Sequence, residues 1–308
     1  MKRVLITGAS GFVGSHLTKY LRSLNLHVFG FDLRPPDTNA DFYIGELADR
    51  ALVSRTLLEV KPDVIFHLAG MIKSSQPEDL YRTNLLGTTT FFDSIIDCGL
   101  HPVVVLASSS AVYGSGFGGK PINEQFKLRP VTHYAVSKLA QEIAALRYFD
   151  AFQLPVMIVR MFNLLGPGQS PDLACSAFAR QIALAELHGQ NEIVTGNLDA
   201  CRDFVDVRDA VRAFGLVVEK GKTAQVYNIC SGRAVAIRTC LDEMISMSSH
   251  QFKIRVDSDR LQKNDVLVQI GSAHKLNRVT GWRPQISLRE SLLDLLEDWR
   301  ERIKSELE

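Results

Sequence analysis

The sequence predicts an α/β protein whose core is a doubly wound parallel sheet. Short runs of β-branched and apolar residues alternate with longer segments that carry apolar residues at helical spacing. A glycine-rich turn directly follows the first of these runs. Continuous apolar runs are typical of strands buried on both faces, and parallel strands require crossover helices between them. We therefore predict this sheet within residues 1–163 and a smaller α/β lobe within 164–308, with part of 203–231 able to return to the first domain.

Each expected element of the first domain rests on its own pattern. The segment 11–24 carries apolar residues on one helical face directly after the glycine-rich turn, and 133–149 does so before the last strand. The segment 81–98 is apolar around much of its circumference, so we expect a helix that lies deep in the core or also meets a partner subunit. The expected strands are 3–7, 27–31, 63–67, 103–107 and 155–160.

The second half of the chain is less regular. After residue 170 the alternation weakens, and isolated strands and loops separate the helical segments. This pattern indicates a smaller lobe that binds the substrate. Its expected helices lie near 174–188, 208–219, 235–247 and 287–303.

The composition excludes several classes of partner. Hydrophobic residues make up 46% of the 308 residues and charged residues 22%, as in an ordinary globular protein. The 35 lysines and arginines nearly balance the 34 aspartates and glutamates. The chain therefore has no overall basic field that would hold a nucleic acid or an anionic membrane, and any anion site must be local.

The cysteines and the first residues indicate a cytoplasmic protein. The five cysteines form no CxxC pair, which argues against both a disulfide framework and a metal site. The apolar run after Met1 ends at Gly8, far short of a signal-peptide core or a membrane span. The cysteines are Cys98, Cys175, Cys201, Cys230 and Cys240.

The stretch GASGFVG predicts a dinucleotide site of the Rossmann type. It follows the first strand and opens a helix, where a tight turn lets a pyrophosphate approach backbone N–H groups at the helix N-terminus. The candidates in this turn are Gly8, Gly11, Phe12, Val13 and Gly14. Leu68, Ala69 and Gly70, which follow the strand at 63–67, complete this set of backbone candidates.

Two further residues bear on the choice of cofactor. Asp32 ends the second strand, where a carboxylate can accept hydrogen bonds from both hydroxyls of an adenosine ribose, which favours NAD. Arg34 lies two residues further on, and its guanidinium could pair with the 2′-phosphate of NADP. The sequence therefore predicts NAD or NADP and leaves the preference open.

The stretch THYAVSK places Tyr134 four residues before Lys138, so the two side chains share one face of a helix. A free phenol has a pKa of about 10, and a nearby ammonium should favour its phenolate form. Lys138 would also hold the nicotinamide ribose. In ASSSAVYG, which begins at the end of the strand at 103–107, a serine hydroxyl can meet the same substrate oxygen.

Together these motifs resemble the extended short-chain dehydrogenase/reductase family that acts on nucleotide sugars. The family pattern, counted back four residues from Tyr113, identifies Ser109 as the third catalytic residue beside Tyr134 and Lys138. Dehydratases of this family carry an acidic pair directly after that serine, where this chain has Ser110 and Ala111. Because elimination of water needs that carboxylate, the resemblance argues against a dehydratase.

The second half is most similar to reductases that convert GDP-4-keto-6-deoxy-D-mannose to GDP-D-rhamnose. The similarity lies in MFNLLGPGQS, GNLDACRDFVDVRDAVRA, VYNICSG and TGWRP. It implies that Asn163 and Arg202 face the sugar nucleotide, with Ser109 and Ser110 beside the sugar. Related reductases often have arginine at the position of Gln262, and Arg260 or Lys263 could replace it, so Lys263 is included as a substrate-binding candidate.

The resemblance implies a homodimeric NAD(P)H-dependent reductase of a GDP-linked 4-keto-6-deoxyhexose. Two enzymatic alternatives remain open, a nucleotide-sugar 4-epimerase with bound NAD and a reductase of a dTDP-linked 4-keto-6-deoxysugar. A non-catalytic dinucleotide-binding regulator would keep the glycine turn and Asp32 but would not need Tyr134 and Lys138. The stereochemistry at C4 is not readable from the sequence.

Overall fold

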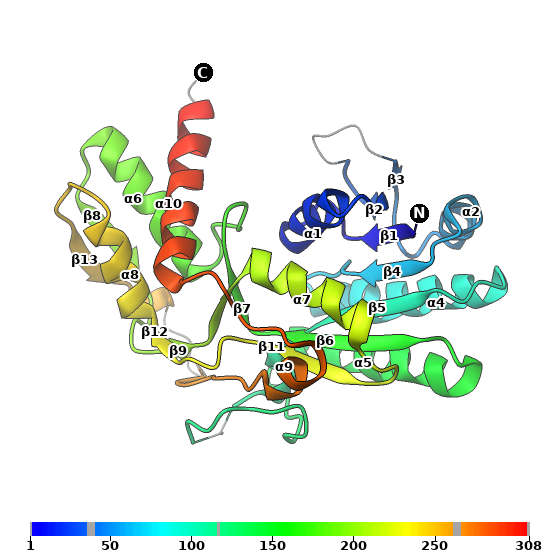
Figure 1. The fold of residues 1–308 in the computed structure, drawn as a ribbon. Coiled ribbons are helices and arrows are strands. Elements are labelled where there is room, and N and C mark those ends of the chain that lie inside the picture. The colour runs from blue at the N-terminus through cyan, green and yellow to red at the C-terminus, as the bar shows by residue number, and fades with distance from the viewer. Residues whose placement is uncertain (1, 36–40, 116–117, 261–265, 307–308) are drawn as a thin grey trace.

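The core of the protein is one parallel sheet with helices on both faces. The structure is a computed structural model that describes residues 2–35, 41–115, 118–260 and 266–306. Within these ranges the main sheet has seven strands in the order β11-β6-β5-β4-β1-β2-β3, and every adjacent pair is parallel (Figure 1). The order reverses between β1 and β4, which makes the sheet doubly wound and confirms the predicted fold class.

The strands of the main sheet coincide with the apolar runs of the sequence. All four residues of β4 are buried, as expected where helices cover both faces of a sheet. Two short strands, β3 and β11, were not among the expected elements. The strands are β1 (Arg3–Thr7), β2 (His27–Asp32), β3 (Phe42–Ile44), β4 (Val64–His67), β5 (Val103–Ser109), β6 (Val156–Met161) and β11 (Val226–Ile229).

Two apolar layers attach the helices to the main sheet. On one face, Leu17 of α1 (Phe12–Ser23) and Phe214 of α7 (Val207–Lys220) pack in one cluster with β1 and β4. On the other face, α2 (Arg50–Val60), α4 (Thr88–Asp97) and α5 (His133–Phe152) form the second cluster. α1, α4 and α5 lie where the sequence predicts crossover helices, whereas α2 was not among the expected elements and α7 was expected in the second lobe.

The expected helix 81–98 is interrupted. It consists of the end of α3 (Pro77–Tyr81), a π-helical turn η1 (Arg82–Gly87) and α4. Phe91, Phe92 and Ile95 are buried in the core, whereas Leu86 is 57% exposed. The helix therefore lies in the core and also leaves an apolar side chain at the surface.

A second lobe is built from the second half of the chain. Helices α6 (Ala174–His188), α8 (Ile237–Ser246) and α10 (Leu288–Ser305) pack around their own apolar cluster, seen at the left of Figure 1. Three two-stranded sheets accompany them. These pair β7 (Asn163–Leu165) with β10 (Phe204–Asp206), β8 (Glu192–Thr195) with β13 (Lys253–Val256), and β9 (Cys201–Arg202) with β12 (Val235–Ala236).

The chain returns to the main sheet after the first part of this lobe. α7 packs against α1, and β11 pairs in parallel with β6. A short helix α9 (His274–Thr280) joins the same apolar cluster through Leu276. The division of the chain at residue 163 stays a prediction, and this return of 207–229 lies inside the segment for which a return was allowed.

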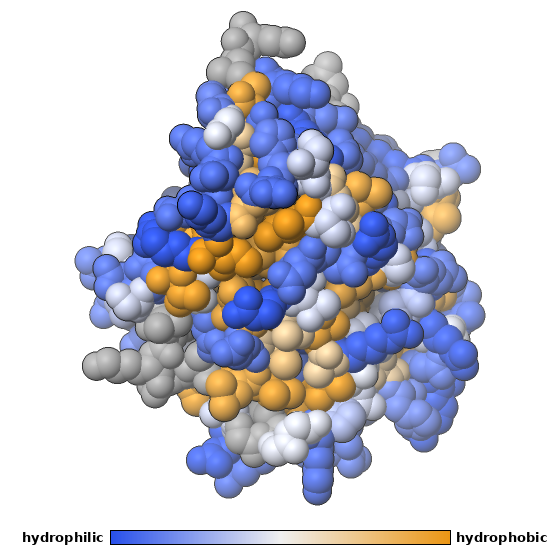
Figure 2. Space-filling view, turned by 90° about the vertical axis from the view of Figure 1, so that its left-hand side faces the viewer, coloured by the Kyte–Doolittle hydropathy of each residue, from blue (hydrophilic) through white to orange (hydrophobic). Residues whose placement is uncertain are grey.

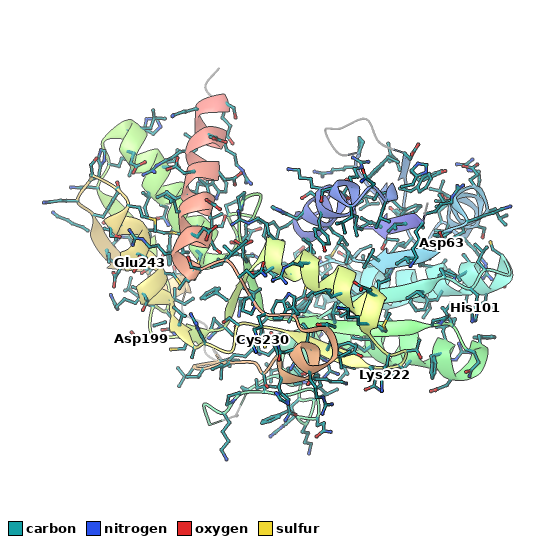
Figure 3. All side chains as sticks on the ribbon, in the orientation of Figure 1. Asp63, His101, Asp199, Lys222, Cys230 and Glu243 are labelled. Carbon is teal, nitrogen blue, oxygen red and sulfur yellow. The ribbon has the colours of Figure 1, made fainter. Side chains whose placement is uncertain are left out.

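The carboxyl ends of the main strands face the second lobe. In Figure 3, Asp63, His101 and Lys222, which precede β4, β5 and β11, lie at the end of the sheet away from that lobe. Cys230, which follows β11, lies between the sheet and the lobe. Ligands of doubly wound folds bind at the carboxyl ends of the strands, so this arrangement puts the expected site between the two parts.

The outer face of the second lobe mixes charged and apolar residues. Figure 2 shows apolar residues gathered across the middle of that face and along its lower part, with charged residues around them. Leu187, Val256 and Leu293 are among the exposed large apolar side chains of this lobe. None of the helices in the described ranges is long and apolar enough to cross a membrane.

Candidate active site

The glycine turn after β1 has a geometry that only glycine accommodates. Gly8 has a φ of +73°, and a Cβ placed on it would lie 2.7 Å from the backbone nitrogen of Ala69. A Cβ on Gly14 would lie 2.1 Å from the carbonyl oxygen of Gly8. Gly11 caps α1 without a side chain, and Phe12 and Val13 begin the helix. The helix N-terminus is therefore open to an anion, and the residues present fit a dinucleotide pyrophosphate.

The loop after β4 connects this turn to the predicted catalytic lysine. The backbone N–H groups of Leu68 and Ala69 donate to the carbonyl and the hydroxyl of Thr7, at 3.1 and 3.3 Å. A Cβ on Gly70 would lie 3.7 Å from Nζ of Lys138. The structure thus brings Leu68, Ala69 and Gly70 into one continuous wall between the glycine turn and Lys138.

Asp32 and Arg34 lie at the rim of the same turn. Oδ2 of Asp32 accepts a hydrogen bond from the N–H of Ser10 at 2.9 Å, and Oδ1 accepts from the N–H of Leu33 at 2.7 Å. The carboxylate is half-buried and keeps lone pairs for ribose hydroxyls. Arg34 is exposed and its carbonyl accepts from the hydroxyl of Ser10 at 2.6 Å. Asp32, which favours NAD, and Arg34, which could bind the phosphate of NADP, are therefore both bonded to Ser10 at this rim.

Tyr134 and Ser109 meet as the motif predicts. Thr132 caps α5, its hydroxyl accepting from the N–H of Ala135 at 3.1 Å, so Tyr134 lies in the first turn of the helix. Ser109 is the last residue of β5, and its hydroxyl lies close enough to the Tyr134 phenol to oppose, by hydrogen bonding, the rise in the pKa of that phenol. Both side chains are half-buried. A ligand oxygen at this point could contact both hydroxyls.

Lys138 is buried and faces away from water. Its ammonium donates to the carbonyl oxygen of Ala107 at 2.6 Å and to the side-chain oxygen of Gln141. Burial lowers the pKa of Lys138 to about 8, and the negative charge of Glu142 opposes that shift. The lysine therefore lies beneath the tyrosine on α5, as the spacing predicts, and titrates closer to neutrality than a free lysine.

The pKa of Tyr134 shifts in the direction opposite to the one expected from the spacing. Burial raises the pKa of the phenol, and the hydrogen bond to Ser109 only partly opposes this. The ammonium of Lys138 is instead engaged by Ala107 and Gln141. Desolvation therefore outweighs the effect that a nearby ammonium was expected to have on the phenol.

A buried ion pair supports α5, and the sequence analysis missed it. Glu142 accepts two hydrogen bonds from Arg160 of β6, at 2.9 Å from Nε and 2.6 Å from Nη2, and a third from the hydroxyl of Ser108. Arg160 also donates to the hydroxyl of Tyr113 at 3.0 Å. All four side chains are buried. One feature of the sequence could have indicated this pair, because Arg160 is the only charged residue in the apolar run 155–160.

Asn84 is a second residue that sequence reasoning missed. Its side-chain nitrogen donates to the hydroxyl of Ser137 and to the carbonyl of Met71, both at 2.9 Å. Its oxygen accepts from the N–H of Met71 at 2.7 Å. The π-helical turn η1 carries this side chain, which ties the loop after Gly70 to the residue before Lys138. Such turns often occur at functional sites, but nothing in the sequence marks this one.

Ser110 is buried and engaged by another residue. Its hydroxyl donates to the side-chain oxygen of Gln269 at 3.3 Å, and the amide of Gln269 donates back to the carbonyl of Ser110 at 3.1 Å. Gln269 lies near the start of the described range 266–306. Lys263 lies outside the described residues. A sugar-binding role for Ser110 and Lys263 therefore stays a prediction.

Asn163 and Arg202 are brought together by the small sheets. Asn163 pairs with Phe204 across β7 and β10, and Arg202 lies two residues before Phe204. Both predicted residues are half-buried. The Arg202 guanidinium donates to the carbonyl oxygens of Cys201, at 3.0 Å, and Val266. They are thus neighbours at the entrance to the second lobe, and their contact with a substrate stays a prediction.

Asp203 fixes the loops around these two residues. Its carboxylate accepts hydrogen bonds from the N–H and hydroxyl of Ser231, at 2.7 and 2.6 Å, and from the N–H groups of Gly232 and Gly271, at 2.9 and 3.0 Å. Asp203 is fully buried, and this burial raises the pKa of its carboxyl. Its role is therefore to join three loops rather than to form a surface ion pair with Arg202.

Residues 4–230 match the protein family described as the NAD dependent epimerase/dehydratase family. The chain belongs to this family. It is 32% identical to the GDP-6-deoxy-D-mannose reductase of Pseudomonas aeruginosa, with 99% of each chain covered. It is 30% identical to the GDP-6-deoxy-D-talose 4-dehydrogenase of Aggregatibacter actinomycetemcomitans, with 91% of each covered. The structure of RMD from Pseudomonas aeruginosa complexed with NADPH has a TM-score of 0.88 at 31% identity, covering 98% of this chain and 100% of that one.

The epimerase/dehydratase match covers most of the predicted site. It includes the glycine turn, Ser109, Tyr134, Lys138 and Arg202, and it ends directly after β11. The reductase and the NADPH-bound structure extend the similarity through the second lobe. Among the described residues, no group of three or more histidine, cysteine, aspartate or glutamate side chains could hold a metal ion.

Proposed function

We propose that this protein is an NAD(P)H-dependent oxidoreductase that reduces the C4 keto group of GDP-4-keto-6-deoxy-D-mannose to GDP-D-rhamnose. The observation that carries the proposal is the hydroxyl pair of Ser109 and Tyr134, which lies above Lys138 at the end of the wall leading from the glycine turn. The full-length similarity to GDP-6-deoxy-D-mannose reductase supports the substrate, because D-rhamnose is 6-deoxy-D-mannose.

The residues that would hold the dinucleotide follow from the shape of the site. Backbone groups of Gly8 to Gly14 would hold the pyrophosphate, and Asp32 or Arg34 would contact the adenosine ribose or its phosphate. Leu68 to Gly70 would line the path to the nicotinamide, and Lys138 would hold its ribose. When bound, the reduced cofactor supplies the hydride that goes to C4. The coexistence of Asp32 and exposed Arg34 supports use of either NADH or NADPH.

Side chains of the protein supply the proton that the C4 oxygen needs. Tyr134 donates its phenolic proton to the C4 oxygen, and Ser109 donates a hydrogen bond that orients this oxygen. The raised pKa of Tyr134 keeps the phenol protonated, as an acid must be before it acts. The ammonium of Lys138 stabilises the phenolate that remains. Positioned proton transfer of this kind contributes about 10²–10⁴-fold to the rate.

The sugar nucleotide would lie between the two parts of the molecule. Arg202 has a planar guanidinium suited to paired hydrogen bonds with a diphosphate, and Asn163 can donate without adding charge. Both lie near the loops that Asp203 fixes. Ser110 and Lys263 complete the proposed binding set.

A second product is supported by the similarity to a GDP-6-deoxy-D-talose 4-dehydrogenase. Talose and mannose differ only in configuration at C4, so the same site would give the talose product if it presented the other face of the ketone to the hydride. An epimerase with bound NAD remains the alternative within the family. Bound NAD that survives dialysis in stoichiometric amount would favour the epimerase.

The decisive experiment mixes the protein with NADPH or NADH and freshly prepared GDP-4-keto-6-deoxy-D-mannose, follows nicotinamide absorbance, and identifies the product by NMR. We expect oxidation in step with GDP-D-rhamnose, and the Tyr134→Phe variant should lose about 10²–10⁴-fold in kcat while it still binds cofactor. If folded protein oxidises neither cofactor, this substrate is wrong. If Tyr134→Phe turns over at the wild-type rate, the mechanism is wrong.

We also propose a cytoplasmic homodimer formed by η1 and α5. Leu86 of η1 is 57% exposed, and Val136 and Ile143 of α5 are 38% and 62% exposed on the neighbouring helix. Apolar side chains gathered on adjacent helices are typical of a subunit interface. Sedimentation should give a dimer for the wild type and a monomer for Ile143→Glu, with Leu58→Glu on the exposed face of α2 as the control. A monomeric wild type would contradict the proposal.

A further inference from the structure

A buried amide side chain holds the ammonium of Lys138. Lys138 is 5% exposed and Gln141 is fully buried, and Nζ donates to the side-chain oxygen of Gln141 and to the carbonyl of Ala107. Gln141 follows Lys138 by three positions, so both lie on the inner face of α5. The ammonium therefore has one fixed backbone acceptor and one side-chain acceptor.

The orientation of the Gln141 amide is set by the next residue in the chain of hydrogen bonds. The Thr88 hydroxyl donates its only proton to the carbonyl of Asn84 at 2.8 Å. Its oxygen can then only accept, and it accepts from the side-chain nitrogen of Gln141 at 2.7 Å. Because the nitrogen of the amide must face Thr88, the oxygen must face Lys138.

His67 continues this chain of hydrogen bonds from Thr88 to Thr7, next to the glycine turn. Its Nε2 lies 2.9 Å from the Thr88 oxygen, and its Nδ1 lies 2.9 Å from the Thr7 hydroxyl. Since Thr88 has no proton left to give, Nε2 is the donor, and Nδ1 accepts from Thr7. Burial lowers the pKa of His67 to about 3, so the ring stays neutral in this one tautomer. Thr7 directly precedes Gly8 of the dinucleotide turn.

We propose that Gln141 is a positioning residue for the reduction, holding the Lys138 ammonium beneath Tyr134, and that Thr88, His67 and Thr7 lock its amide in the required orientation. The part that Lys138 plays in turnover rests on the proposed function, whereas the contact between Gln141 and the ammonium does not. The hydrogen-bonded chain joins the turn that would hold the pyrophosphate to the lysine that would hold the nicotinamide ribose.

The charges around Lys138 decide how strongly Gln141 acts. Glu142 of α5 favours the ammonium, although its carboxylate is already paired with Arg160 of β6. Tyr134 of the same helix is protonated, and His67 of β4 is neutral. Burial lowers the pKa of Lys138 to about 8, so a further fall of about one unit on the loss of one acceptor should convert a largely charged lysine into one that is about half neutral at pH 7.

The test measures Lys138 directly in the free protein. Lysines carrying ¹³C at the ε position are titrated by NMR, and the Lys138 signal is assigned by its loss in Lys138→Met. In Gln141→Met, which removes the oxygen at nearly constant volume, the midpoint should fall by about one pH unit. In Gln141→Glu, which puts a carboxylate against the ammonium, the midpoint should rise by at least as much.

The matched control is Gln181→Met in α6. Gln181 also bonds its backbone surroundings, accepting from the N–H of Val194 at 2.8 Å, but it lies in the second lobe. Its loss should leave the Lys138 midpoint unchanged. Thr88→Val, which removes the anchor of the amide at nearly constant volume, should shift the midpoint in the same direction as Gln141→Met by a smaller amount. Thr88→Val therefore provides a second measurement of the Lys138 midpoint if a Gln141 variant fails to fold.

The kinetic and spectroscopic readouts separate two kinds of failure. If the wild type turns over the substrate, the alkaline limb of its kcat profile should move in the same direction as the NMR midpoint in each variant. If the wild type has no turnover, the proposed function fails while the NMR titration still decides this inference. Unchanged Lys138 midpoints in folded Gln141→Met and Gln141→Glu would overturn it.

Discussion

The ion pair between α5 and β6 gives a stability prediction whose size follows from its geometry. Glu142 and Arg160 have side chains that are 3% and 4% exposed, and they share two hydrogen bonds. In Glu142→Gln the charge is lost and an amide N–H₂ faces guanidinium donors, so one bond is replaced by a contact between donors. Leaving a buried charge without its partner costs about 3–5 kcal/mol.

The lower end of that range applies here. The guanidinium keeps its bond to the Tyr113 hydroxyl at 3.0 Å and a long contact with the carbonyl of Glu124 at 3.5 Å. We therefore expect Glu142→Gln to lose about 3 kcal/mol of unfolding free energy. The matched control is Glu243→Gln, because Glu243 pairs with Arg289 at the surface, where such a pair contributes about 0–1 kcal/mol.

Urea unfolding followed by tryptophan fluorescence would measure both variants. The chain has two tryptophans, and both are buried: Trp282 packs in the cluster of the main sheet and Trp299 in that of the second lobe. A Trp299→Phe background therefore reports on the part that contains Glu142. A loss below about 1 kcal/mol in Glu142→Gln would refute the reasoning, because it would place a buried pair in the range of a surface pair.

Two other predictions concern the glycine turn and Lys138. Gly14→Ala should abolish binding of NADPH and NADH in a fluorescence titration, because its Cβ would lie 2.1 Å from the Gly8 carbonyl. Gly99→Ala has open space around its Cβ but a φ of +64°, so it should cost some stability and, in the folded protein, bind as the wild type does. Retained cofactor binding in Gly14→Ala would contradict the proposed role of the glycine turn in holding the pyrophosphate. Lys138 has a folded-state pKa of about 8 and an ordinary value of 10.5, so the unfolded chain binds more protons between these values and the lysine makes stability rise with pH across that window. Lys138→Met should flatten this rise in unfolding free energy measured from pH 7 to 10, and an unchanged slope would show that the lysine is not desolvated.

The parts of the fold that the sequence predicted are those whose signal is local. The apolar runs at 63–67 and 103–107 became β4 and β5 because a strand buried on both faces has no polar side to interrupt the run. Gly8 and Gly14 were identifiable from their spacing directly after the first strand, and the structure shows that neither position has room for a side chain. These features depend on a few consecutive residues, which a single sequence displays in full.

What the sequence could not predict depends on residues far apart in the chain. Asn84 reaches Ser137 only because a π-helical turn redirects it, and no residue pattern distinguishes that turn from an ordinary helix. Arg160 is buried because Glu142, from the preceding helix, neutralises it. The expected lowering of the Tyr134 pKa failed because burial raises it, and the Lys138 ammonium is engaged by Ala107 of β5, far away in the sequence.

Helix α5 shows how the fold and the proposed site depend on each other. Its buried residues include Ser137, Lys138, Gln141 and Glu142, so the face turned toward the core is in large part polar. A buried polar face is stable only if each group on it finds a partner. Those partners come from β5, β6 and η1, through the Ala107 carbonyl, the Arg160 guanidinium and the Asn84 amide. The same contacts that stabilise this polar face in the core therefore hold the lysine in place. A substitution among these contacts should change both the stability of the protein and its catalytic rate.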